Sequence, residues 1–118
     1  MEEYYIYKIN PNFLTFSLKY PKTIHFIARK EPSEFDDKQR NLIFQDHSEL
    51  NEQLKKVFIQ RNDYTYKKNT HYIRNKFTGA YSFVRIYDHA IYLKCSSNFH
   101  IMKNIILQCD SNYVILDK

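Results

Sequence analysis

The chain has 118 residues, of which 43% are hydrophobic and 17% aromatic, and its formal net charge is +5. This length suits a single domain spanning residues 1–118, because most domains contain roughly 100–150 residues. The sequence shows neither an apolar run of about 18 residues nor a basic segment followed by an apolar stretch at its start, so we expect no membrane span, no secretory signal and a cytoplasmic location.

The first half of the chain predicts one strand followed by a helix. Residues 3–9 (EYYIYKI) are β-favouring and neither alternating face is wholly polar, which predicts an interior strand covered on both sides. Asn10 followed by Pro11 is typical of a helix start. Pro21 ends this helix or restarts a second one. Residues 22–30 are ambiguous between a short helix and a strand.

Two more helices are expected before the middle of the chain. A polar helix is predicted around residues 35–45, with Asp36 and Asp37 at its electropositive end. Ser48 should cap the next helix, because the residues after it place apolar side chains on one core-facing stripe. This stripe consists of Leu50, Leu54, Val57 and Phe58.

The second half predicts a hairpin, a helix and a final strand. Residues 62–79 are basic and non-periodic, which indicates an extended connection with strand character. Residues 80–95 alternate on both sides of Asp88-His89 and predict a β-hairpin. Ser97 or Asn98 should cap a helix, and residues 112–117 read as a strand. The expected fold is α+β: a small mixed or antiparallel sheet of N-terminal strand, hairpin and C-terminal strand, with three to four helices on one face.

The sequence gives little support for catalysis or metal binding. Gly79 is the only glycine, which excludes glycine-rich phosphate loops and nucleophile elbows. None of the five histidines lies three or four residues from another histidine or a cysteine, so no local zinc pattern exists. Cys95 and Cys109 are expected to be two small buried hydrophobes. We therefore expect no cofactor, no metal and no enzymatic activity.

A nucleic-acid interface is an alternative hypothesis. Residues 53–103 carry ten Lys and Arg against two Asp and Glu, and rings are interleaved with cations there. Stacking and phosphate contacts use this combination, although a solubilising surface or a half-buried sheet edge would look much the same. The candidate residues are Tyr64, Tyr66, Lys67, Lys68, His71, Tyr72, Arg74, Lys76 and Arg85.

Two segments carry a resemblance to a known family. Residues 3–13 (EYYIYKINPNF) resemble the opening strand and helix of the SirA-type sporulation inhibitors of DNA replication from Firmicutes. Residues 81–117, with YSFVRIYDHAIYLKC, FHIMKNIILQC and YVILD, resemble the closing hairpin, helix and strand of that family. The resemblance implies a non-enzymatic protein that binds the N-terminal domain of the replication initiator DnaA and blocks its action at the origin.

The resemblance also implies a binding surface. It is built largely from the first helix, on which Phe13 matches an early aromatic residue of the family. One turn later, where the family has another aromatic residue, this chain has Ser17, for which Phe16 or Tyr20 are possible substitutes. Gln39 and Leu42 align with a second contributing helix. The implied partner-binding residues are Phe13, Phe16, Ser17, Tyr20, Gln39 and Leu42.

Overall fold

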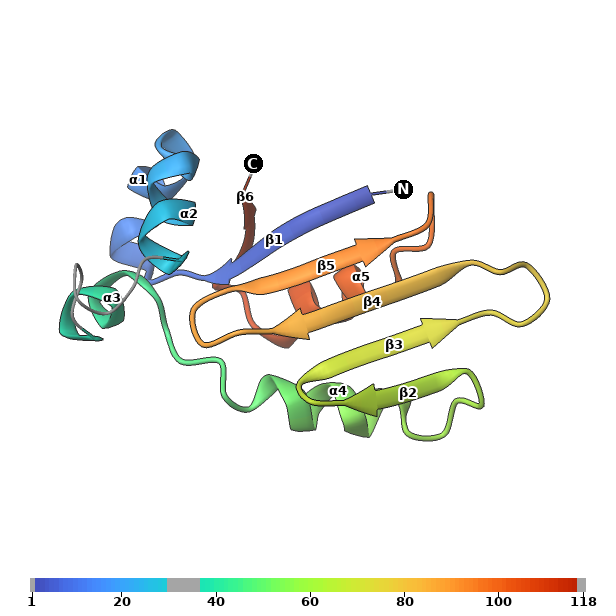
Figure 1. The fold of residues 1–118 in the computed structure, drawn as a ribbon. Coiled ribbons are helices and arrows are strands. Elements are labelled where there is room, and N and C mark those ends of the chain that lie inside the picture. Colours follow the sequence, from blue (N-terminus) through green and yellow to red (C-terminus); the bar gives the residue numbers. More distant parts are fainter. Residues whose placement is uncertain (1, 30–36, 117–118) are drawn as a thin grey trace.

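The structure is a computed structural model that describes residues 2–29 and 37–116, and it consists of one antiparallel sheet with two helices behind it and the remaining helices at one end (Figure 1). Within these residues the sheet has six strands in the order β2-β3-β4-β5-β1-β6. The strands are β1 (Glu2–Lys8), β2 (Tyr64–Lys67), β3 (Thr70–Arg74), β4 (Tyr81–Ile86), β5 (Ile91–Cys95) and β6 (Tyr113–Leu116). The predicted α+β class is therefore confirmed, and the first and last strands pair beside the hairpin.

The helices divide between the two faces of the sheet. They are the short 3₁₀ helix η1 (Pro11–Phe13), α1 (Leu14–Lys19), α2 (Pro21–Arg29), α3 (Asp37–Ile43), α4 (Leu50–Phe58) and α5 (Ile101–Cys109). Figure 1 shows α4 and α5 behind the sheet, where Leu54 and Ile106 join the larger core cluster. Ile24 and Ile27 of α2 pack into a second cluster with Tyr7. The expectation that all helices share one face is thus wrong.

Strand β1 connects the two core clusters. Ile6 and Tyr7 are both 0% exposed, and adjacent residues of a strand point to opposite faces. Ile6 belongs to the cluster under α4 and α5, whereas Tyr7 belongs to the cluster under α2. The prediction of an interior strand covered on both sides is confirmed.

The sheet has two strands beyond those predicted, because part of residues 62–79 forms a second hairpin. β2 and β3 pair in antiparallel register around Lys68 and Asn69, whose φ angles are 48° and 59°. Two consecutive residues with positive φ match the twist of a two-residue hairpin, a turn that usually contains glycine. The Lys-Asn pair gave no such signal, and this explains why the sequence indicated only an extended connection.

Several predicted helix boundaries differ from the structure. α4 and α5 begin after Glu49 and His100, and neither of these residues forms a side-chain capping bond. Ser48 does not cap α4, because its hydroxyl donates a 2.8 Å hydrogen bond to the Asp46 carboxylate instead. Asn98, one of the two alternative caps, has a φ of 65° two residues before the observed cap. Asp36 lies outside the described residues.

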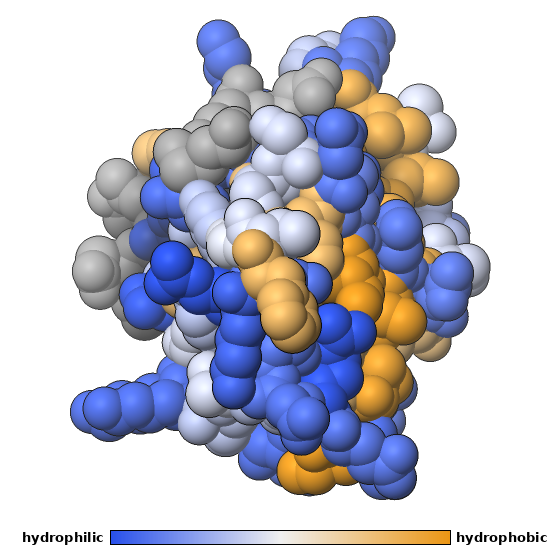
Figure 2. Space-filling model, turned by 90° about the vertical axis from the view of Figure 1, so that its right-hand side faces the viewer, coloured by the Kyte–Doolittle hydropathy of each residue, from blue (hydrophilic) through white to orange (hydrophobic). Residues whose placement is uncertain are grey.

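The two ends of the molecule present different surfaces. Figure 2 views the end farthest from α1 and α2, where hydrophilic side chains dominate and hydrophobic ones lie mainly toward the right-hand side, with smaller groups near the centre and at the bottom. At the other end, residues 14–26 supply half of the large apolar side chains that are exposed in the described part of the chain. These five are Leu14, Phe16, Leu18, Tyr20 and Phe26. This concentration makes α1 and α2 the first candidate for a binding surface.

Candidate protein-binding surface

The start of the first helix is fixed by Asn10. Its side-chain oxygen accepts a 3.0 Å hydrogen bond from the backbone N–H of Asn12, and its amide nitrogen donates to the carbonyl of Leu42 at 3.1 Å. The backbone N–H of Asn10 also donates to the carbonyl of Ile43 at 2.8 Å. One residue therefore caps η1, where Pro11 follows as expected, and holds it against the end of α3.

The helix α1 has an inverted pattern of burial: its polar residue Ser17 is buried, and its apolar residues are exposed. Among its six residues only Ser17 is buried, and the Ser17 hydroxyl donates a 2.8 Å hydrogen bond to the carbonyl of Phe13. Two pairs of apolar side chains spaced four residues apart remain exposed on the flanks of the helix. Their exposed fractions are 37% for Leu14, 60% for Leu18, 40% for Phe16 and 46% for Tyr20.

The aromatic rings of Phe16 on α1 and of Tyr20, the residue directly after α1, contact each other. The ring centroids of Phe16 and Tyr20 are 5.2 Å apart, with 48° between the ring planes. This distance is typical of an interacting aromatic pair, so each ring restricts the motion of the other. We name the four exposed side chains Leu14, Phe16, Leu18 and Tyr20 the α1 surface.

Helix α2 anchors this region to the sheet. His25 is buried, and its Nδ1 shares a hydrogen bond with the hydroxyl of Tyr7. Burial raises the pKa of Tyr7 above its usual range, so the hydroxyl stays protonated. Arg40 of α3 is also buried, and its Nε donates to the carbonyl of Ile27 at 3.3 Å. These bonds hold α2 to both β1 and α3.

The structure describes the side chains of five of the six implied residues, and these lie in different environments. Phe16 and Tyr20 are exposed on α1, and Leu42 is 60% exposed on α3. Phe13 is half-buried and packs against the second core cluster, whereas Ser17 is fully buried. The side chain of Gln39 lies outside the described residues.

Leu14, Leu18 and Phe26 were not identified from the sequence. The first two are spaced like a core-facing pair, and this spacing does not tell which side of a helix faces solvent. Their exposure is evident only once Ser17 is seen to occupy the buried side of α1.

The candidate nucleic-acid residues of β2 and β3 divide between two faces. His71 is buried on the face covered by α4, where its Nδ1 lies 2.8 Å from the Tyr64 hydroxyl and its Nε2 lies 2.8 Å from Oδ1 of Asn51. Burial, assisted by nearby Lys55, lowers the pKa of His71 to about 4. His71 and Tyr64 are therefore structural, whereas Tyr72, which follows His71 in β3, points to the opposite face.

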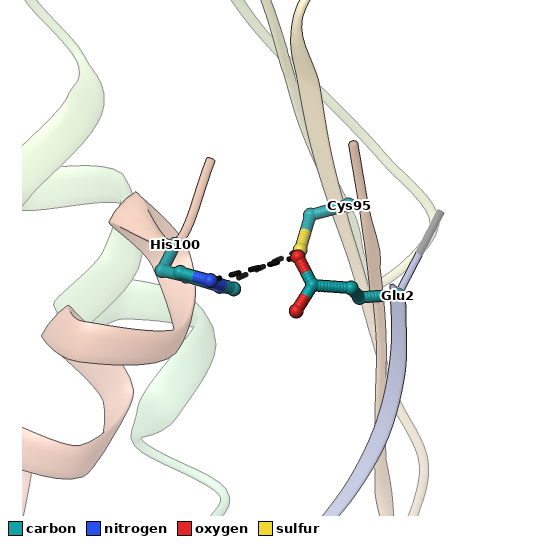
Figure 3. A group of neighbouring side chains, drawn as sticks. All are labelled: Glu2, Cys95 and His100. Carbon is teal, nitrogen blue, oxygen red and sulfur yellow. Dashed lines mark hydrogen bonds and ion pairs between the residues drawn. The ribbon is translucent and has the colours of Figure 1, made fainter. Parts of the chain in front are cut away.

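A further polar cluster lies where β1, β5 and α5 meet (Figure 3). Nδ1 of His100 is 3.9 Å from Sγ of Cys95, and Nε2 is 3.5 Å from Oε2 of Glu2. No pattern in the sequence connects Glu2 with Cys95, because only the sheet register places the two residues opposite each other. The three donor atoms lie within 4.8 Å of one another and are types that bind zinc.

The chemistry of this cluster favours a structural role. Each ring nitrogen of His100 already faces one partner, and one metal ion can bind only one of the two nitrogens. Cys95 is 0% exposed, and burial raises the pKa of its thiol. A protonated, inaccessible thiol is a poor nucleophile. We therefore regard the cluster as a hydrogen-bonded link between the two strands and α5.

A comparison of the sequence with protein-family models finds no match, and a comparison with curated proteins finds none either. None of the helices in residues 2–29 and 37–116 has the length and apolar character required to cross a bilayer.

Proposed function

We propose that this chain is a non-enzymatic inhibitor of chromosome replication that acts in the cytoplasm by binding the N-terminal domain of the initiator DnaA through the α1 surface. The observation that carries the proposal is the inverted burial of α1, which hides Ser17 and exposes four apolar side chains. The resemblance of residues 3–13 to the SirA-type family supplies the identity of the partner.

The energetics of α1 support a binding role. Burying apolar surface contributes roughly 25 cal/mol per Å². The exposed leucine and aromatic side chains do not gain this free energy in the isolated chain, but they would gain it if a partner covered them. Binding energy at interfaces concentrates in a few residues, often aromatic ones. The contact between Phe16 and Tyr20 also limits the entropy that these rings lose on binding.

The anchor position in this chain differs from the one that the resemblance implies. Phe13 packs against the core cluster that contains Ile24, and its backbone carbonyl accepts a hydrogen bond from the Ser17 hydroxyl. We therefore assign the anchor role to Phe16 and Tyr20, with Phe13 as their support. Leu42 adds an exposed apolar side chain on α3. The backbone carbonyl of Leu42 accepts a hydrogen bond from the side chain of Asn10, which precedes η1.

Calorimetric titration of the chain with the purified N-terminal domain of DnaA tests the proposal. The wild-type chain should bind at micromolar concentrations, and the double variant Phe16→Ala, Tyr20→Ala should bind at least about tenfold more weakly, since hot-spot truncations cost more than about 1–2 kcal/mol. Phe77→Ala is the matched control, because Phe77 is a fully exposed phenylalanine in the β3–β4 turn at the opposite end.

Two results would overturn the proposal. One is absence of binding at tens of micromolar, an order of magnitude above the expected range. The other is equal binding by the wild-type chain and the double variant. A supporting measurement in cells is the ratio of origin to terminus DNA, which should fall when the wild-type chain is produced and stay unchanged with the double variant.

A further inference from the structure

Among residues 2–29 and 37–116, no helix covers β3, β4 and β5 on the face of the sheet opposite α4 and α5. Figure 1 looks onto this face. The helices α4 and α5 lie behind the sheet, and α1 and α2 lie beyond the C-terminal end of strand β1. Seven large side chains that alternate with buried residues point outward from these strands, beside the smaller Thr70. They are Tyr72, Arg74, Tyr81, Phe83, Arg85, Tyr92 and Lys94, and we name them the open sheet face.

The strand register places rings beside cations on this face. Tyr72 lies opposite Phe83, which in turn lies opposite Lys94. The neighbouring rows pair Arg74 with Tyr81 and Arg85 with Tyr92. Because adjacent strands are about 4.8 Å apart, every ring lies within reach of a positive charge.

The rings also leave room for a ligand. They line a shallow depression of about 560 Å³ whose walls include Tyr72, Phe83, Tyr92 and Lys94. The Phe83 and Tyr92 rings meet edge to face, with centroids 6.2 Å apart. The guanidinium carbon of Arg85 lies 5.5 Å from the Phe83 ring centroid. Aromatic rings and the cations Arg74 and Lys94 therefore line the same depression.

The cations of this face outnumber the acidic residues beside them, although Glu3 of β1 lies opposite Lys94 in the strand register. Within the described residues the side chains of Arg74 and Lys94 take part in no ion pair, and neither do those of Lys67 and Lys68 beside the face. Lys67, Lys68 and Arg85 line a second depression of about 360 Å³. Glu3 is the acidic residue on the adjoining strand, and its carboxylate accepts a 3.0 Å hydrogen bond from the Tyr92 hydroxyl.

We propose that the open sheet face binds single-stranded nucleic acid, with bases stacking on Tyr72, Phe83 and Tyr92 and phosphates contacting Arg74, Arg85 and Lys94. An excess of cations complements a phosphate backbone, and accessible rings complement unpaired bases. A duplex keeps its bases stacked internally and leaves these rings without partners. The site lies apart from the α1 surface and does not depend on the function proposed above.

Fluorescence anisotropy of labelled oligonucleotides tests this site. The probes are an oligothymidine, an oligouridine of the same length, and a DNA duplex, each titrated at several salt concentrations. One or both single strands should bind more tightly than the duplex, and the comparison between them shows whether DNA or RNA is preferred. With about three phosphate contacts, the logarithm of the affinity should fall with the logarithm of salt concentration with a slope of about −2.

Two variants address the rings and the cations separately. Phe83→Ala should weaken binding at least about fivefold, since stacking contributes about 1–3 kcal/mol per base. Arg74→Gln changes an exposed side chain, so it should leave folding intact and make the salt slope shallower by about one phosphate contact. Lys56→Gln is the charge-matched control, because Lys56 is an exposed cation on α4. This control should bind like the wild-type chain.

The proposal is overturned if neither single strand binds at tens of micromolar in low salt, or if the duplex binds as tightly as the single strands. Wild-type affinity in both Phe83→Ala and Arg74→Gln would overturn it as well. The double variant Phe16→Ala, Tyr20→Ala should retain oligonucleotide binding, and Phe83→Ala should retain binding to the DnaA domain. The two proposals can therefore fail independently.

Discussion

The hydroxyl of Ser17 donates a 2.8 Å hydrogen bond to the carbonyl of Phe13, and this bond lies on the only buried side of α1. A fully buried serine leaves no space for a larger side chain, because protein interiors are close-packed. An aromatic residue at this position would have to displace α1 from the core. The exposed pair of Phe16 and Tyr20 follows directly from this arrangement.

Substitutions at Ser17 should therefore separate stability from binding. Ser17→Phe should lower the free energy of unfolding by about 1–3 kcal/mol or more, because it overpacks the site. Ser17→Ala should lower it by about 1 kcal/mol and leave binding to the DnaA domain unchanged. Urea denaturation and calorimetry measure the two quantities. A Ser17→Phe variant with wild-type stability and tighter binding would show that position 17 faces the partner.

The stability of the protein should depend on pH through His71. Folding lowers its pKa from the usual 6.5 to about 4, so between these pH values the unfolded chain binds more protons than the native protein. Titration of His71 leaves the free energy of unfolding unchanged above about pH 6.5 and lowers it as the pH falls toward 4, by about 3 kcal/mol in total. Burial lowers the pKa of His47 too, which acts in the same direction.

Urea denaturation at a series of pH values between neutral and mildly acidic measures this loss. His71→Gln removes the titrating group, so the variant should lose less stability on acidification than the wild-type chain. Equal losses in both proteins would show that His71 is not the responsible group.

The buried hydrogen bond between Tyr7 and His25 should contribute to stability. Tyr7→Phe removes the hydroxyl and leaves the facing ring nitrogen of His25 without this partner. The free energy of unfolding should fall by about 1–2 kcal/mol. Tyr87→Phe provides the control, since Tyr87 is 49% exposed and should tolerate the change. Equal stability of the two variants would argue against the bond.

The two thiols should differ in reactivity. Cys95 is fully buried and Cys109 is partly exposed, and burial raises the pKa of both thiols. A thiol reagent should modify Cys109 slowly in the native protein and Cys95 only after unfolding in denaturant. The native Cys109→Ser variant should be unreactive. Rapid labelling of that variant would show that the cluster with His100 opens to solvent.

Local patterns in the sequence predicted much of the secondary structure. Alternation in residues 3–9 and 80–95 predicted β1 and the β4–β5 hairpin, and Asn10-Pro11 marked the start of η1. These predictions succeed because periodicity and capping depend on residues a few positions apart. The β2–β3 hairpin was missed, since Lys68 and Asn69 adopt positive φ angles without the usual glycine.

The sequence alone determined that this is a small α+β protein with an apolar first helix and a cationic, aromatic second half. Only the tertiary structure decided which side chains face solvent. Packing hides Ser17 and exposes Phe16, and strand register separates the buried His71 from the accessible Tyr72. Both outcomes depend on contacts between residues far apart in the chain, and local composition and spacing carry no information about such contacts.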